Sequence, residues 1–420
     1  MKVDVQPQQL IYKPITTKAE LRASLQAALY LEFATIPPYL TAVYSMKDKS
    51  AEAYQIIRSV ALEEMLHINL VCNLLLAIGY SPLFVKPASD PFEDKVPYIS
   101  ELKYPNYILP KFYDGPYVQI LAASPELIKQ TFMAIEEPMQ FNQPLPAAGE
   151  RFTSIGQIYQ AIKEGFKTLA PDVFTGTPDH QKTNYYFGSG GGKAIKVTNL
   201  DTAEQAIEQI VQQGEGATPP TTQYRPKQPY GTYNRYGHRN DGTYGPILGT
   251  PFELSHYFKF RAIADGKIPL PSTYPMLPNP SIEKFSEEYA KKLASQFQDN
   301  YSLMIQALEQ AFADNADTTA YFTTVVELMQ SVFPPVITQL MKTPISADTN
   351  STLGPTAGPC FEYKAGASCM SMITKVSEFK QKCLQQDEVS RSMVDTWQKV
   401  EEALQKISKK IEGTPLEKHL

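Results

Sequence analysis

The sequence predicts a mainly α-helical protein: a four-helix bundle with loop and short-strand insertions, followed by additional C-terminal helices. Two observations carry this prediction. Long stretches of the chain place apolar residues at helical spacing, as amphipathic helices do. Within those stretches a glutamate and a histidine three positions apart occur twice on an apolar face, at Glu64/His67 and Glu253/His256. The chain therefore combines helical packing with polar groups that point inward.

Composition places the chain among globular proteins. It has 420 residues, of which 43% are hydrophobic and 11% aromatic, enough to fill a substantial core. The formal net charge is −5, and no basic stripe of the kind that follows phosphates is present. We therefore expect no nucleic-acid partner.

Compartment and redox state follow from the N-terminus and the cysteines. The first residues, MKVDVQPQQL, contain no apolar signal core, and the longest apolar run, 68–79, is too short to span a bilayer. We expect a cytoplasmic protein without a membrane partner. The four cysteines show no CxxC spacing. Cys360 and Cys369 could form a loop disulfide, but free thiols are expected in the cytoplasm.

The first helix is predicted to begin after Thr17, which can form a capping box with Glu20. Glu32 lies inside its apolar stripe, and Pro37 and Pro38 are expected to kink it. A second helix is predicted over 51–79. Because Glu64 and His67 follow Val60 by four and seven positions, they share the apolar line of that helix.

The remaining bundle helices are interrupted by insertions. Residues 81–120 lose the helical period and are expected to form loops with some strand, and a second insertion covers about 138–200. Helical patterns return at 125–137 and 155–168. A further helix is predicted to begin with Asp201 as its cap, and another with Thr250 as its cap and Pro251 in its first turn.

Two domains are expected: a bundle domain over 1–275 and a helical C-terminal region over 276–420 that packs on it. The C-terminal region ends in an apolar stripe from Val394 to Ile411. Two packings fit this stripe: against the bundle, or along the seam of a homodimer.

Glu-x-x-His is the unit that carries the chemistry. A spacing of three puts a carboxylate and an imidazole side by side on one helix face, so each pair can bind one metal ion. One carboxylate from each of two further helices would complete a metal pair. Glu32 supplies the first. Glu215 is the expected second, with Glu208 as its competitor and Glu136 and Glu164 as more distant ones.

Structural explanations compete with this assignment. A single Glu-x-x-His often occurs by chance, and a buried histidine is usually a hydrogen-bonded core residue. Glu253 lies three residues after Thr250 and could be its capping partner instead of a ligand. Glu63 is expected to be the solvated neighbour of Glu64. Yet burying several carboxylates without partners would cost several kcal/mol each, and metal is the economical partner.

Several segments resemble a known family. They are LYLEFATIPPYLTAVYSM, SVALEEMLHINLVCNLLLAIG, FMAIEEP, SIGQIYQAI, VQQGEG and LSHYFKF, with a weaker echo in GPTAGPCFEY. Over residues 15–265 they resemble the ferritin-like family typified by the C-terminal region of the iminophenyl-pyruvate dimer synthase of violacein biosynthesis. The resemblance implies a ferritin-like bundle with a di-iron or similar site.

The resemblance also bears on individual residues. It supports the metal-ligand set Glu32, Glu64, His67, Glu215, Glu253 and His256. Tyr39, two turns after Glu32, matches a tyrosine found beside the metals in ferritins and is the candidate catalytic residue. The chain has no room for the haem-bearing region of that synthase. We therefore expect no haem and do not transfer its coupling activity.

A shell of Glu and His with open positions suits two Fe ions, or Mn or a mixed Fe/Mn pair. The preferred hypothesis is an O2-dependent oxidase or oxygenase acting on a small, amino-acid-derived molecule in specialised metabolism. Arg235, His238 and Tyr236, in a Tyr-rich loop at 217–249, are the candidate substrate contacts, although such a loop can equally just pack over a bundle end. The alternatives are iron storage and a non-catalytic metal-binding module.

Overall fold

The computed structural model describes residues 11–138, 143–183, 192–214, 254–314, 318–346, 354–367, 369–385, 393–414 and 416. The chain divides into two compact units. The first comprises residues 1–82, 88–97 and 104–273, and the second comprises 83–87, 98–103 and 274–420. The described residues are mostly helical, as predicted.

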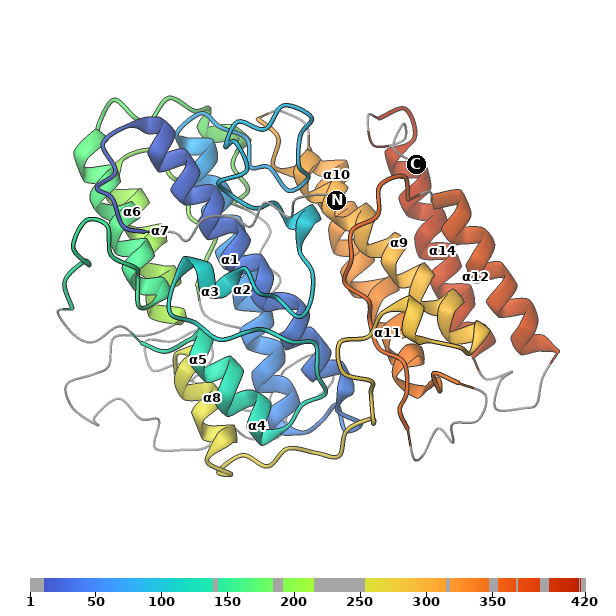
Figure 1. Cartoon of the computed structure of the whole chain (residues 1–420). Helices are drawn as coiled ribbons and strands as arrows, with labels where there is room; N and C mark the ends of the chain where they lie inside the picture. The colour runs from blue at the N-terminus through green and yellow to red at the C-terminus, as the bar shows by residue number, and fades with distance from the viewer. Residues whose placement is uncertain are drawn as a thin grey trace, which may run out of the picture. The chain divides into compact units, whose positions relative to one another are not determined.

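Two long helices form the continuous half of the N-terminal unit. Helix α1 spans Lys18–Ser45 and helix α2 spans Glu52–Ala77, and they lie side by side (Figure 1). Thr17 and Glu20 form the predicted capping box at the start of α1. Both helices are buried along most of their length because neighbours cover more than one face. Helix α2 is long and apolar enough to span a membrane, but 89% of its most apolar window is buried in the protein.

Short helices form the other half. The segment α4 (Pro125–Leu127), η2 (Ile128–Phe132) and α5 (Met133–Ile135) ends at Glu136, and η2 is a π-helix. Helix α8 (His256–Ala264) packs against this segment. Helices α6 (Ile155–Leu169) and α7 (Leu200–Gln213) pair with each other along the other part of α1 and α2 (Figure 1).

In a four-helix bundle α1 and α2 are two of the four helices. The segment α4–η2–α5 followed by α6 takes the place of the third helix, and α7 followed by α8 takes the place of the fourth. The third is interrupted between Glu136 and Ile155, and the fourth between Gly214 and His256. Residues from both interruptions line one small cavity beside α1 and α2. Four helix ends therefore meet around a single point of the core.

Two predicted helix starts are wrong in detail. Asn199, not Asp201, caps α7, where its side chain accepts a hydrogen bond from the backbone N–H of Thr202. Helix α8 begins at His256 after Ser255, which has an extended backbone. The predicted cap Thr250 and first-turn Pro251 lie outside the described residues.

The insertions carry short helices, and in the described ranges isolated β-bridges stand in place of the expected strands. Within the N-terminal unit these helices are α3 (Leu109–Phe112) and η3 (Pro178–His180), and η1 (Ile99–Glu101) belongs to the C-terminal unit. The buried Asn73 side chain of α2 fixes the second insertion by donating hydrogen bonds to the carbonyls of Lys182 and Ile195, both at 3.0 Å.

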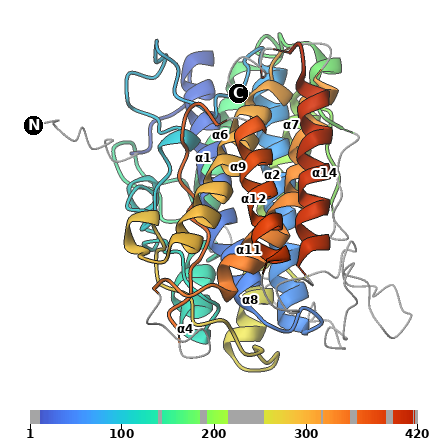
Figure 2. The ribbon, with the colours of Figure 1, turned by 90° about the vertical axis from the view of Figure 1, so that its right-hand side faces the viewer.

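The described part of the C-terminal unit is built mainly from helices. They are η5 (Ile282–Lys284), α9 (Glu288–Ala311), α10 (Thr319–Glu327), the π-helix η6 (Leu328–Val332), α11 (Phe333–Lys342), α12 (Cys369–Leu384) and α14 (Val394–Ile411). Helices α12 and α14 lie side by side in both views (Figures 1 and 2).

The apolar stripe of α14 is buried within this unit. Trp397 is fully buried and its ring lies 5.1 Å from that of Phe379 on α12, between ring centroids. Val400, Leu404 and Ile407 continue the same buried line. The stripe therefore has a partner within the chain, while a homodimer stays a prediction, as does packing of this region on the bundle. All four cysteines are free and buried, as expected.

Candidate metal centre

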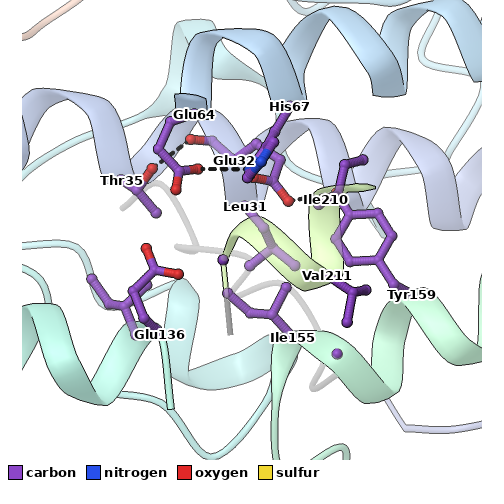
Figure 3. Close-up of a pocket in the computed structure, with 13 residues that line it drawn as sticks. Leu31, Glu32, Thr35, Glu64, His67, Glu136, Ile155, Tyr159, Ile210 and Val211 are labelled. Atoms are coloured by element: carbon purple, nitrogen blue, oxygen red, sulfur yellow. Dashed lines mark hydrogen bonds and ion pairs between the residues drawn. The ribbon is translucent and has the colours of Figure 1, made fainter. Parts of the chain in front are cut away.

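Three carboxylates and two histidines meet in the core of the N-terminal unit. Helix α1 supplies Glu32, α2 supplies Glu64 and His67, the end of α5 supplies Glu136, and the first turn of α8 supplies His256. None of these residues is more than 5% exposed. Figure 3 shows the carboxylates of Glu32 and Glu64 beside His67, with Glu136 on the facing segment.

Their ligand atoms form two groups that share one residue. In the first, Nδ1 of His67 lies 3.3 Å from Oε2 of Glu32 and 3.6 Å from Oε2 of Glu64. In the second, Nδ1 of His256 lies 2.8 Å from Oε1 of Glu64 and 3.5 Å from Oε1 of Glu136. Within each group the ligand atoms lie within 4.8 Å of one another. Glu64 thus turns one oxygen toward each group, as a bridging carboxylate does.

Each outer carboxylate receives a hydrogen bond from a buried tyrosine. The hydroxyl of Tyr159 on α6 donates to Oε1 of Glu32. The hydroxyl of Tyr39 on α1 donates to Oε1 of Glu136 at 2.7 Å. The aromatic rings of Phe132 and Phe260 pack against Tyr39 and fix its orientation. The two tyrosines therefore hold equivalent positions on opposite sides of Glu64.

The histidines differ in what their second ring nitrogen meets. Nε2 of His67 lies 3.2 Å from the amide oxygen of Gln213, at the end of α7. Nε2 of His256 lies 2.9 Å from Oε2 of Glu63. The same oxygen of Glu63 accepts a hydrogen bond of 2.7 Å from Nζ of Lys259, and both Glu63 and Lys259 are buried.

The cluster buries three carboxylates close together, so positive charge nearby would stabilise it. Burial raises the pKa of Glu64 to about 7, and the neighbouring Glu136 acts in the same direction. Burial alone would lower the pKa of His67, but the charges and hydrogen bonds of Glu64 and Glu32 outweigh it and raise this pKa to about 10. The pKa of His256 is raised by Glu136, Glu63 and Glu64 against the same effect of burial. Protons on the histidines or bound cations can supply the charge.

A cavity of about 20 Å³ lies beside four residues of the cluster (Figure 3). This is room for one or two water-sized bodies, at roughly 10–15 Å³ each. Glu32, Glu64, His67 and Glu136 line it together with Tyr159 and several apolar side chains. The volume that the described residues enclose suits small ions.

The donor set fits a pair of divalent metal ions. Nδ1 of His256 is buried and makes no hydrogen bond, although a carboxylate oxygen of Glu64 lies 2.8 Å away. A shared cation would satisfy both atoms. Carboxylate oxygens with one imidazole nitrogen per position, and no thiolate, match Fe or Mn better than structural Zn. Two Glu/His groups on bundle helices, joined by one carboxylate, are also the arrangement of di-metal carboxylate proteins.

Comparison with known proteins agrees with this geometry. A family model described as ferritin-like matches residues 25–265, which is more than half of the chain. The chain belongs to the ferritin-like family. The ferritin-like match contains every described residue of the cluster and of its tyrosine and glutamate partners.

Two curated relatives are similar at low identity. A 2-imino-3-(indol-3-yl)propanoate dimerase of Chromobacterium violaceum is 24% identical over 395 residues, covering 82% of this chain and 34% of that protein. A dichlorochromopyrrolate synthase of Lentzea aerocolonigenes is 22% identical, covering 83% of this chain and 36% of that protein. The chain thus spans about a third of the length of these relatives.

A solved structure shares the fold. The crystal structure of a ferritin-like protein from Caulobacter vibrioides aligns with a TM-score of 0.52 and 21% identity. The alignment covers 84% of this chain and all of the other. Together with the helical architecture described above, it confirms the predicted fold class.

The structure brings together four of the predicted metal ligands: Glu32, Glu64, His67 and His256. It places the candidate catalytic residue Tyr39 beside Glu136. The other predicted ligands, Glu215 and Glu253, lie outside the described residues, as do the candidate substrate contacts Arg235, Tyr236 and His238.

Two competing ligands are excluded by their positions. The Glu208 side chain is 56% exposed and faces Lys163, and the Glu164 side chain is 50% exposed and pairs with Lys167. Glu136, which the sequence ranked as a distant competitor, occupies the position beside His256 instead. The sequence did contain a signal for Glu136, because this residue lies within FMAIEEP, one of the segments that resemble the ferritin-like family.

Glu63 was expected to be solvated, and this expectation is wrong. It is 1% exposed and binds His256 and Lys259, because α8 covers the face of α2 that a single apolar stripe leaves open. Lys259 could have been found, since it follows His256 by three positions and so shares its helix face. Tyr159 carries no such local signal.

Proposed function

We propose that this protein is a di-metal, preferably di-iron, O2-dependent oxidase or oxygenase acting on a small organic molecule. The observation that carries the proposal is Glu64, whose two oxygens each face a separate Glu/His group. Structural histidine and glutamate pairs do not require a carboxylate shared in this way. A bridged metal pair does.

Glu32 and His67 would hold one ion, Glu136 and His256 the other, and Glu64 both. A reduced iron pair, when bound, supplies electrons for the reduction of O2. Among the described residues each position would have two ligands of its own besides the bridge, which leaves room for Glu215, Glu253 or a small molecule as further ligands. Iron is preferred, and manganese or a mixed pair fits the same donors.

The surrounding residues would control protons and water. Burial, together with Glu136 and Glu64, raises the pKa of Tyr39, so its hydroxyl stays protonated and fixes one oxygen of Glu136. Burial and Glu32 raise the pKa of Tyr159 in the same way. Leu31, Ile135 and the other apolar residues that line the cavity keep bulk water from the cluster. Such a dry environment strengthens electrostatic interactions at the site.

The substrate class rests on the relatives. One is named for dimerising 2-imino-3-(indol-3-yl)propanoate, which is an imino acid with an aromatic ring, and the other for making dichlorochromopyrrolate. This supports a small, amino-acid-derived substrate in specialised metabolism. Arg235 and His238 would bind its carboxylate and Tyr236 its ring, which stays a proposal.

A non-catalytic metal-binding or iron-handling protein is the second candidate. The size of the cavity that the described residues line favours it, because about 20 Å³ holds ions but not an organic substrate.

The test is metal content followed by oxygen reactivity. Protein from iron- and manganese-supplemented cells is expected to hold about two ions per chain, and His67→Ala and His256→Ala to hold markedly fewer. His180→Ala, a histidine outside the cluster, is the matched control. Anaerobic loading with Fe(II) and a pulse of O2 should produce a ferric absorbance band.

Two outcomes would count against the proposal. Wild-type protein without metal, and histidine variants that are merely less stable, would leave a helical scaffold with buried polar pairs. Two ions per chain that stay ferrous under O2 would support the non-catalytic candidate instead.

A further inference from the structure

The two halves of the cluster have matching inner ligands. Each has one histidine that presents Nδ1, one carboxylate of its own and one oxygen of Glu64. Each outer carboxylate accepts a hydrogen bond from one tyrosine hydroxyl. Among the described residues, differences between the two positions therefore lie outside these ligands.

The clearest difference lies at the far side of each imidazole. His67 has the neutral amide oxygen of Gln213 at 3.2 Å, and this contact is only partly buried. His256 has the carboxylate of Glu63 at 2.9 Å, and this contact is fully buried. A hydrogen bond to a carboxylate is shorter and roughly twice as strong as one between neutral groups. It also makes the opposite ring nitrogen a stronger metal ligand.

Lys259 keeps Glu63 suited to this role. Its ammonium is 0% exposed and donates to the same oxygen, Oε2, that faces His256. The buried ammonium and carboxylate need each other, because either alone would be costly in the core. Since Lys259 and His256 share a face of α8 while Glu63 belongs to α2, the three residues also tie α8 to α2 at the metal centre.

We propose that Glu63, held in place by Lys259, makes the His256 position the tighter of the two metal positions, so that it fills first. This inference rests on the metal pair of the proposed function. Glu63 is a positioning residue: it contacts the histidine and not the metal. Outer partners of this kind change metal affinity by roughly 10–100-fold.

The test measures each position separately with Co²⁺ and a competing chelator. His67→Ala leaves the His256 position, and His256→Ala leaves the His67 position. Adding Glu63→Gln to His67→Ala should weaken Co²⁺ binding by roughly 10–100-fold. Adding it to His256→Ala should change binding less than about twofold. Gln213→Ala is the matched control and should act only in the His256→Ala protein.

Folding is controlled by a second variant. Glu63→Gln removes the negative charge that faces the buried ammonium of Lys259, so Glu63→Gln/Lys259→Met removes both charges together. It should weaken the His256 position as Glu63→Gln does, while the metal-free protein keeps its helical circular dichroism.

Wild-type protein should take up Co²⁺ in two steps that differ by at least about tenfold. Equal steps, or a His256 position that is indifferent to both Glu63 variants, would overturn the inference and leave the metal pair intact. Wild-type protein that binds no Co²⁺ would overturn the inference and the proposed function together.

Discussion

The two units of the chain use their cores differently. In the N-terminal unit the core holds four carboxylates, two histidines and a lysine, all at most 5% exposed: Glu32, Glu63, Glu64, Glu136, His67, His256 and Lys259. In the C-terminal unit the shortest described ion pairs reach the surface through lysine side chains between 23% and 60% exposed, although the Asp299 and Glu401 carboxylates are buried: Lys375–Asp299, Lys380–Glu401 and Lys406–Glu327. Trp397 and its apolar neighbours fill the centre instead.

The two cores contribute differently to the free energy of unfolding. An apolar core gains free energy from burial, whereas buried charges cost several kcal/mol each unless partners compensate them. The N-terminal unit is therefore less stable than its buried apolar surface alone would make it. Positive charge at the cluster, from metal ions or protonated histidines, compensates the cost of burying the carboxylates. Removing the shared carboxylate of Glu64 should therefore change metal binding most.

Glu64→Ala should have the largest effect on the cluster. Because Glu64 belongs to both ligand groups, we expect metal content to fall from about two ions per chain to near zero. Glu136→Ala removes a ligand from one group only and should leave about one ion. Elemental analysis of the purified variants measures both, and a Glu64→Ala protein that retains two ions would rule out the bridging role.

Trp397→Ala should have the largest effect on the C-terminal unit. Truncating a fully buried tryptophan leaves a cavity between α12 and α14 and should cost about 3–5 kcal/mol in the free energy of unfolding. Urea denaturation followed by circular dichroism gives the value. Metal content should stay at the wild-type level, and its loss would show that the two cores are not independent.

Lys406→Ala should have the smallest effect. Its side chain is 60% exposed, and its ion pair with Glu327, at 2.7 Å, is worth about 1 kcal/mol or less. In the same urea experiment, the free energies of unfolding of wild type and Lys406→Ala should differ at low salt and agree at high salt, because salt screens the ion pair. A loss in the free energy of unfolding well above about 1 kcal/mol would mean that the Lys406–Glu327 pair stabilises the unit more than an exposed ion pair does.

The long helices and half of the site could be predicted from sequence because their signals are local. Glu32 interrupts one apolar stripe, and Glu64 with His67 interrupts another, so the period of the helix alone places them on buried faces. The segment around His256 was found through the same spacing, although α8 begins only at that residue. The role of Glu253 stays a prediction.

The rest depended on long-range packing. Glu136 lies 72 positions from Glu64 in sequence and follows a π-helix, so no regular period leads to it. Glu63 points about 100° away from Glu64 around α2 and is buried only because α8 covers that side. A helical-wheel analysis assumes that a helix has one buried face. Helix α2 is buried on more than one face because α1, α7 and α8 all pack against it.

The π-helix η2 has a consequence for how the site could arise or be lost. A π-turn contains one residue more than an α-turn, and it fits that residue by widening a single turn of the helix. Deleting one residue from 128–132 would therefore restore regular winding and leave Glu136 on the same side of the segment. In the descent of this chain, one inserted codon could have produced η2 without displacing the second metal position, whereas an insertion that the helix does not absorb as a π-turn would rotate Glu136 by about 100°.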